Sequence, residues 1–499
     1  MDNRQLSELP SRKSALSLLS PGDAAKSVRR WFLVMNPKVQ VRRIGHLIVL
    51  AVMVCCLISF ASAEWKEKVL YSFQGGTDGS LPGGGVVFDK AGNLYGVTVE
   101  GGSAACPPGW CGTIYRLSPP TQKGGSWTET VLYVFKGHNQ NDGSSPSGSL
   151  IADSAGNFYG VTGYGGSGPC VLFGTATGCG TVFEISPPAK QGDPWTETVL
   201  YNFQGGKDGD LPTGPLVFDS AGNLYGATEF GGGKGTTCDE FYGGNCGTVF
   251  KLSPPKSKGG QWTEKVLHSF AGIGTGKQYG DGAEPNGGLA LDSAGAIYGT
   301  TFYGGYNCPH NSNQGCGTVF ALKPPTKRGE PWTEELMHVF RAGNDGGGPN
   351  GGLIFDKAGS VYGTAGGGPS GDAGIVFRLM KNKAGAWQKA VLYGFDWKDG
   401  ADPLAGLIFD SSGSLYGTTY VGNGKELQGS VFRLKPPHEK GKPWIIGYLH
   451  GFVKPPDGMF PAAKLVFDRA GNLYSTTQEG GSATGCGDGG CGTVFEVHP

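Results

Sequence analysis

Short runs of Val, Ile, Leu, Phe and Tyr alternate with clusters of Gly, Asp, Asn and Pro along the chain from Glu64 onward. Short apolar runs that are bounded by turn residues are typical of β-strands. No stretch in this part of the sequence has apolar residues recurring at helical spacing. The hydrophobic pattern therefore predicts an all-β domain.

The strand pattern is repeated. An apolar run led by tryptophan occurs seven times and ends each time in phenylalanine. It is followed by a D-G-x-x-P loop, an L-V-F-D-like strand, an A-G-N-like turn, an L-Y-G-T-T-like strand, a variable glycine-rich loop and a G-T-V-F-x-L-like strand. Four short strands per period predict a β-propeller, because each small sheet buries both faces only between neighbours. The tryptophans are Trp65, Trp127, Trp195, Trp262, Trp332, Trp387 and Trp444.

The two ends of the repeat array complement each other. The array opens with a tryptophan-led strand, residues 65–73, and its last repeat lacks that fourth strand. Placing this strand on the outer edge of the blade formed by residues 464–497 closes a seven-bladed ring of four-stranded antiparallel blades, which also covers exposed strand edges. Antiparallel order then puts the D-G-x-x-P and glycine-rich loops on one rim, called the upper rim, and the A-G-N turns on the lower rim.

The N-terminal segment, residues 1–63, has the features of a targeting sequence. Arg42 and Arg43 precede an apolar run, residues 44–60, and an A-x-A cleavage pattern at Ala61-Ser62-Ala63. The run is shorter than the ~20 residues of a membrane span, so we expect a removed signal peptide and no retained span. The leader is over-long, which indicates translation from Met35. Residues 64–499 then form the propeller of an exported protein, extracellular or periplasmic.

Cysteines occur in pairs inside the glycine-rich loops. Every repeat has two or none, which predicts one disulfide per loop. Zinc sites favour C-x2-C-like spacing, whereas four to eight residues separate these pairs, so we expect no metal and no cofactor. The pairs are Cys106 and Cys111, Cys170 and Cys179, Cys238 and Cys246, Cys308 and Cys316, and Cys486 and Cys491.

Composition and charge exclude one class of partner. Lys plus Arg and Asp plus Glu number 41 each, and no basic stripe is present, so nucleic acid is excluded. The sequence also contains no nucleophile elbow, H-E-x-x-H motif or phosphate-binding loop, which favours a protein that is not an enzyme.

One repeated carboxylate series has two interpretations. The aspartates of the D-G-x-x-P loops could form a ring that holds cations, or they could stabilise turns by bonding their own backbone. A feature present in all seven repeats favours the turn interpretation. The series is Asp78, Asp142, Asp208, Asp281, Asp345, Asp399 and Asp457.

Positions on the upper rim that differ between repeats are better candidates for a ligand site. Aromatic side chains with a few carboxylates are typical of sugar or peptide sites, because flat faces stack and polar groups orient the ligand. Alternatively, these aromatics cover their own disulfide loops. The candidates are Glu100, Trp110, Tyr164, Phe230, Phe241, Tyr242, Tyr303, Tyr306 and Glu479.

The V-L-Y-S-F, D-G-x-x-P, L-V-F-D-x-A-G-N-L-Y-G-T-T and C-G-T-V-F-x-L-S-P-P strings resemble the GloVer tandem repeats of exported bacterial proteins. The G-N-L-Y element is also similar to that of NHL-type and gluconolactonase-like propellers. The first resemblance implies a surface or secreted protein.

Two functions remain open. We expect a monomeric, non-catalytic binding module for a glycan, peptide or cell-envelope partner. The alternative is a sugar-acting lactonase, hydrolase or lyase with a site at the mouth of the central channel.

Overall fold

The computed structural model describes residues 65–102, 111–190, 192–233, 246–257, 259–274, 280–306, 308, 315–327, 329–366, 373–422, 428–439, 441–487 and 489–499. The chain divides into Met1–Glu64 and Trp65–Pro499. The first part lies outside the described residues, so the signal peptide and the start at Met35 stay predictions. No helix in the described part of the chain has the length and apolar character needed to cross a bilayer.

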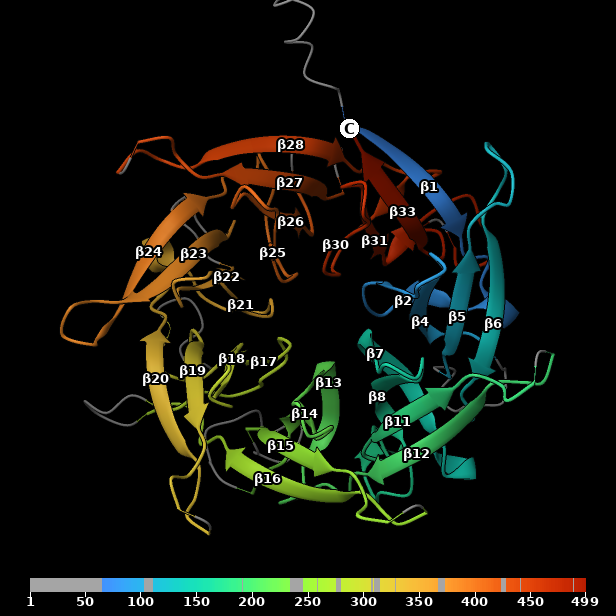
Figure 1. The fold of residues 1–499 in the computed structure, drawn as a ribbon, viewed down its shortest axis with the longest axis horizontal. Helices are drawn as coiled ribbons and strands as arrows, with labels where there is room; N and C mark the ends of the chain where they lie inside the picture. The colour runs from blue at the N-terminus through green and yellow to red at the C-terminus, as the bar shows by residue number, and fades with distance from the viewer. Residues whose placement is uncertain are drawn as a thin grey trace, which may run out of the picture. The chain divides into compact units, whose positions relative to one another are not determined.

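The described residues of Trp65–Pro499 form seven antiparallel sheets of four or five strands, which are arranged around a central axis (Figure 1). This confirms the seven-bladed, all-β propeller. Blade 1 contains β2 (Ser80–Pro82), β3 (Val87–Phe88), β4 (Leu94–Glu100), β5 (Thr113–Ser118) and β6 (Thr128–Val134). Blade 2 contains β7 (Gly143–Ala152), β8 (Phe158–Gly165), β11 (Thr181–Ser186) and β12 (Thr196–Asn202). Blade 3 contains β13 (Asp210–Phe218), β14 (Leu224–Phe230), β15 (Thr248–Ser253) and β16 (Thr263–Ser269).

The remaining blades follow the same order from the centre outward. Blade 4 contains β17 (Ala290–Leu291), β18 (Ile297–Thr301), β19 (Thr318–Lys323) and β20 (Thr333–Val339). Blade 5 contains β21 (Ile354–Phe355), β22 (Val361–Ala365), β23 (Ile375–Lys381) and β24 (Trp387–Gly394). Blade 6 contains β25 (Ile408–Phe409), β26 (Leu415–Thr419), β27 (Ser430–Lys435) and β28 (Ile445–Gly451). Blade 7 contains β30 (Val466–Phe467), β31 (Leu473–Thr477), β33 (Thr493–His498) and β1 (Lys66–Ser72).

Short elements lie in the loops between these strands. The pairs β9 (Val171–Leu172) with β10 (Thr175–Ala176) and β29 (Gly458–Met459) with β32 (Glu479–Gly480) form two-stranded sheets. Single 3-10 turns occupy three D-G-x-x-P loops: η1 (Gly76–Asp78), η2 (His138–Gln140) and η4 (Gly343–Asp345).

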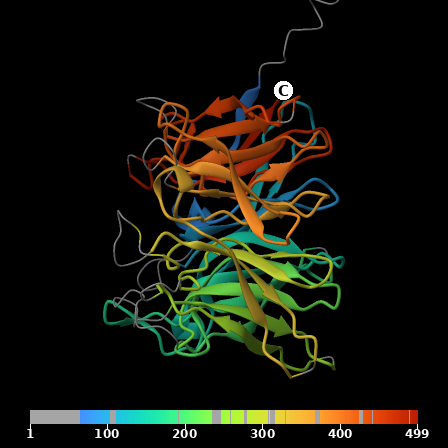
Figure 2. The ribbon, with the colours of Figure 1, turned by 90° about the vertical axis from the view of Figure 1, so that its left-hand side faces the viewer.

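The N-terminal strand closes the ring. β1 pairs antiparallel with β33, from Lys66 opposite His498 to Ser72 opposite Thr493. In the side view of Figure 2, this blue strand lies among the red strands of the C-terminal part. The predicted closure, with one N-terminal and three C-terminal strands in the last blade, is therefore consistent with the structure.

The core lies between blades. The phenylalanine that ends each tryptophan-led strand is fully buried, and Phe203 packs edge-on against Phe250 with ring centroids 5.1 Å apart. Each such ring contributes about 1.5–3 kcal/mol by leaving water. The glycine of L-Y-G makes room for the phenylalanine of the G-T-V-F strand, because a Cβ on Gly226 would lie 2.5 Å from the Phe250 ring.

Backbone contacts confirm the sorting of the loops. The Gly102 N–H donates to the Gly76 carbonyl at 2.6 Å, and the Gly232 N–H donates to the Gly206 carbonyl at 2.7 Å. In each case a glycine-rich loop contacts a D-G-x-x-P loop, so both loop classes share the upper rim.

Candidate functional site

The inner strands surround a central channel of about 570 Å³. Its wall is built largely from backbone and small side chains, including Gly84, Gly148 and Gly287. Two charged side chains, Glu229 and Lys464, are among the described residues that line it. Lys464 is exposed, but the protein around its ammonium removes part of the solvation and lowers its pKa.

A ring of strained residues stands at the upper mouth of this channel. The residue before the proline of D-G-x-x-P has a positive φ, between 50° and 59°, in every repeat. Six of the seven are not glycine, although a left-handed backbone costs other residues about 1–2 kcal/mol. The residue two positions after the strained residue lines the channel in every repeat. We call these residues the mouth ring: Leu81, Ser145, Leu211, Glu284, Gly348, Asp402 and Phe460.

A hydrogen bond to the preceding blade explains this backbone conformation. The Leu211 N–H donates to the Cys179 carbonyl at 3.2 Å, and the Leu81 N–H donates to the Cys491 carbonyl at 3.0 Å. The Phe460 N–H donates to the Gln428 carbonyl in the same way, although the repeat that contains Gln428 has no cysteines. The left-handed turn therefore links neighbouring blades, and the fold needs it whichever side chain is attached.

Disulfides anchor the acceptor side of these bonds. Cys170–Cys179, Cys308–Cys316 and Cys486–Cys491 are bonded as predicted. Cys111 and Cys246 are also disulfide-bonded, while their expected partners, Cys106 and Cys238, lie outside the described residues.

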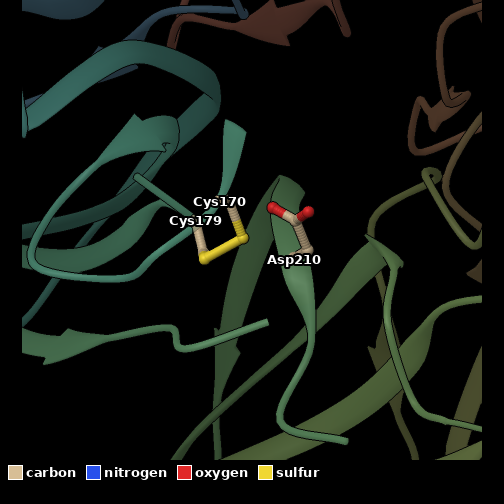
Figure 3. A group of neighbouring side chains, drawn as sticks. All are labelled: Cys170, Cys179 and Asp210. Atoms are coloured by element: carbon tan, nitrogen blue, oxygen red, sulfur yellow. A yellow bond between two sulfur atoms is a disulfide. The ribbon is translucent and has the colours of Figure 1, made fainter. Parts of the chain in front are cut away.

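Asp210 lies next to the first of these disulfides (Figure 3). Cys170 and Cys179 hold their sulfur atoms in the covalent bond. Since thiolates are the zinc ligands, this trio does not form a metal site.

An aromatic and amide group stands where blades 6 and 7 meet the mouth. The rings of Tyr420 and Phe460 are 5.0 Å apart, and the Tyr420 hydroxyl donates to Gln478 Oε1 at 3.1 Å. Gln478 also lines the channel. Burial, followed by the charges of Glu479 and Asp402, raises the pKa of Tyr420. The group thus combines flat apolar faces with an amide and nearby carboxylates.

Two carboxyl groups lie close together at the mouth in blade 3. Burial, followed by the charge of Asp210, raises the pKa of Glu229 to about 7. Burial also raises the pKa of Asp210 to about 6, against a hydrogen bond from the Leu211 N–H. Carboxyl groups with such pKa values can exchange protons near neutral pH.

The described residues that were predicted from sequence belong to several blades and are not part of the channel wall. Phe230 is buried and Tyr306 is 45% exposed. Tyr303 packs partly buried against the core between blades 3 and 4, and Glu479 lies close to Tyr420.

Two other candidates are half-buried at the ends of upper-rim strands. Glu100 pairs with Ser80, and Tyr164 pairs with Ser144. Of the candidates within the described residues, none is among those that line the channel. Trp110, Phe241 and Tyr242 lie outside the described residues.

Glu229 and Gln478 were not among the residues predicted from sequence, and strand parity is the reason. These residues directly precede Phe230 and Glu479, and successive side chains of a strand point to opposite faces. Both of these candidates stand just before the glycine pair, on one face of their strands, whereas Glu229 and Gln478 lie on the other face and line the channel. Alignment of the seven repeats could have found them, since this position also holds Val99, Gly163, Phe302, Gly366 and Tyr420.

Solved structures with a similar fold share little sequence with this chain. A provisionally named glucose dehydrogenase-type oxidoreductase of Thermus thermophilus has 12% identity and a TM-score of 0.42, with 87% of this chain and 100% of that chain covered. A gluconolactonase of Xanthomonas campestris has 15% identity and a TM-score of 0.31, with coverages of 64% and 78%. A Dyadobacter fermentans protein of unknown function has 12% identity and a TM-score of 0.36, with coverages of 77% and 98%.

Family membership rests on sequence. No curated protein matches this chain. The Gloeobacter/Verrucomicrobia repeat matches residues 56–309, 234–442 and 308–499. These matches cover every blade, as the resemblance to GloVer repeats implied. The chain therefore belongs to the Gloeobacter/Verrucomicrobia repeat family.

Proposed function

We propose that this protein is an exported, non-catalytic binding module that recognises a carbohydrate at the upper mouth of its channel. The mouth ring carries the proposal. Glycine would adopt the left-handed backbone there without strain, yet six repeats have larger side chains that differ in size, polarity and charge. The strained backbone serves the fold in every repeat. A ligand site requires side chains that differ between repeats, and the mouth ring has them. Strained backbone with side chains other than glycine is also commonly retained at functional positions.

The chemistry of the mouth favours a sugar. Tyr420 and Phe460 offer apolar ring faces, on which the C–H faces of a sugar ring pack, and the Gln478 amide offers both a donor and an acceptor. Few, well-placed polar groups beside aromatic surface are typical of small-molecule sites. Export agrees with the three disulfides, which persist in oxidising compartments. A cell-envelope glycan is the corresponding partner.

A binding experiment tests this proposal. The purified protein is screened against oligosaccharides, and affinities for any ligand found are measured by calorimetry. Phe460→Ala and Gln478→Ala should each weaken binding about tenfold, the equivalent of one lost contact of ~1.4 kcal/mol. The matched control is Ile445→Ala, which removes a side chain that is 53% exposed on the outer strand β28. Failure to bind any saccharide, or equal affinities in all variants, would contradict the proposal.

The second candidate is a sugar-acting enzyme, which the carboxyl pair at Glu229 and Asp210 favours. A carboxyl group with a pKa of about 7, such as Glu229, suits general acid–base catalysis. Glu229→Gln keeps the size and hydrogen-bonding capacity of the side chain but removes the exchangeable proton. If the protein turns over sugar lactones or glycosides, this variant should lose turnover and keep binding. Turnover that survives the substitution would exclude this catalytic role.

A further inference from the structure

A second set of side chains meets at the outer edge between neighbouring blades. Its members are the aspartate of a D-G-x-x-P loop, the residue six positions after the preceding tryptophan, and the residue two positions after the next tryptophan. In one such set, the Tyr201 hydroxyl donates to Asp208 at 2.7 Å, and the charge of Asp208 acts on Glu264. We call this arrangement an outer-edge set.

Three outer-edge sets have histidine in place of tyrosine, and two of these three also have the glutamate. His268 Nε2 lies 3.2 Å from Asp281 Oδ2, and one ligand atom from each of these residues and from Glu334 lies within 4.8 Å of the others. His450, Asp457 and Glu67 form the same arrangement, again with 3.2 Å between His450 Nε2 and Asp457 Oδ2. An imidazole and two carboxylates are established ligands of zinc.

The distances suit a tetrahedral ion. Nitrogen and oxygen ligands about 2.0–2.2 Å from zinc lie roughly 3.3–3.5 Å from one another. The histidine–aspartate separation is close to this value in both sets. Glu334 Oε1 and Glu67 Oε1 are buried without a hydrogen-bond partner, as are the matching oxygens of the tyrosine sets, at Glu129, Glu197 and Glu264. A buried oxygen without a donor is costly. In the two histidine sets the imidazole adds the third ligand with which a bound cation would satisfy this oxygen.

A third histidine set supplies its own cation. His338 Nε2 lies 3.1 Å from Asp345 Oδ1, and here Lys389 replaces the glutamate. Its ammonium lies 2.6 Å from the same carboxylate oxygen, and its side chain is only 7% exposed. The chain thus puts a positive charge beside the histidine–aspartate pair in this set, whereas the other two sets present a third ligand.

We propose that His268, Asp281 and Glu334 form one divalent-cation site of the zinc class, and that His450, Asp457 and Glu67 form a second. Each site would link the outer strands of two neighbouring blades, β16 with β20 and β28 with β1. The side chains of His268 and His450 are 16% and 22% exposed, so an ion can enter from solvent and keep a water as its fourth ligand. In these two repeats the aspartates that hold the turns would thus also bind metal, contrary to the expectation from sequence that no metal is bound.

Metal binding to the full chain tests the proposal. The protein is produced without a polyhistidine tag, stripped with a chelator and dialysed against zinc alone, and bound zinc is counted per chain. Two equivalents are expected. His268→Tyr and His450→Tyr should each remove one, and the double variant should remove both. These substitutions copy the tyrosine at Tyr71, Tyr133 and Tyr201, whose sets fold with Tyr–Asp hydrogen bonds.

Two further measurements keep the result specific. Glu334→Lys reproduces the outer-edge set in which Lys389 replaces the glutamate, and it should also remove one equivalent of zinc. This variant gives a result even if a tyrosine variant fails to fold. Cobalt substituted for zinc should give d–d bands without a thiolate charge-transfer band, because no cysteine is a ligand in either proposed site. The proposal would be overturned if the wild type bound no more zinc per chain than the double variant, or if all variants retained the zinc of the wild type. A thiolate band would also overturn it.

Discussion

Asp219 illustrates how single carboxylates hold the lower rim. Its Oδ1 accepts hydrogen bonds from the Ala221 and Asn223 N–H groups, both at 2.9 Å. Its Oδ2 accepts from the Asn223 amide at 2.7 Å and from the Tyr225 hydroxyl at 3.0 Å. Burial alone would raise the pKa of Asp219, but these hydrogen bonds lower it below its ordinary value. The repeated aspartate therefore forms a turn that also fixes the tyrosine of the following strand.

Asp219→Ala should lower the free energy of unfolding by about 1–2 kcal/mol at pH 7, because four donors lose their acceptor. The carboxylate has a lower pKa in the fold than the ~3.9 of an unfolded chain. Its contribution is therefore present above about pH 4 and is lost as pH falls through the folded pKa. Chemical denaturation at pH 7 and pH 3 measures both effects.

The matched control for this prediction is Ser220→Ala, at an exposed position in the same turn. It should leave stability unchanged at both pH values. An Asp219→Ala variant that is as stable as the control at pH 7 would show that the turn does not depend on the carboxylate.

At the scale of elements, the glutamates of the outer strands oppose stability at high pH. Glu197 on β12 lies in an outer-edge set with Tyr133 and Asp142. Burial, followed by the charge of Asp142, raises its pKa to about 8. Because the unfolded value is about 4.3, the folded state holds a proton that the unfolded state releases. Stability should therefore fall as pH rises from about 4.3 to 8.

Glu197→Gln mimics the protonated side chain at every pH. We expect it to match the wild type near pH 5 and to be more stable by about 1–2 kcal/mol near pH 9, because it has no proton to lose. Melting temperatures across this range measure the difference. Glu439→Gln, at an exposed loop position, is the control and should show no pH-dependent difference. Parallel pH profiles for wild type and Glu197→Gln would contradict the raised pKa.

Strand parity limits how much of the site could be predicted from the elements alone. Glu229 was missed beside Phe230 because the two side chains leave β14 on opposite faces. The mouth ring was missed because Leu211 or Phe460 gives no sign of a left-handed backbone, which sequence rules assign to glycine. The outer-edge sets combine residues from different strands, such as His268 and Glu334. Their proximity follows only once the order of the outer strands is known.

At the scale of the whole molecule, repetition made the fold predictable. Each strand type is sampled seven times, so an irregular copy does not hide the pattern. The ends were equally informative, because the repeat array lacks one strand at its end and has one extra strand at its start. The pairing of β1 with β33 follows from that arithmetic. The proposed ligand site could not be predicted in this way, since its residues differ between repeats.

Loss of the closing strand should destabilise the whole ring. Deleting residues 65–73 removes the partner of β33 and the fully buried Phe73, which packs against Tyr115 in blade 1 with ring centroids 5.0 Å apart. We expect a loss well above the ~3–5 kcal/mol of one large core side chain, together with faster hydrogen exchange in β31 and β33.

Moving the same strand to the other end of the chain separates closure from simple truncation. Lys66 lies opposite His498, so residues 65–73 attached after Pro499 through a short Asn-Gly turn can re-form the β1–β33 pair as a hairpin. The relocated chain should recover most of the melting temperature and the protection of β33, because the ring needs the strand in its place and not its original connection. A truncated chain that melts like the whole protein, or a relocated strand that restores nothing, would mean that the ring does not depend on this pair.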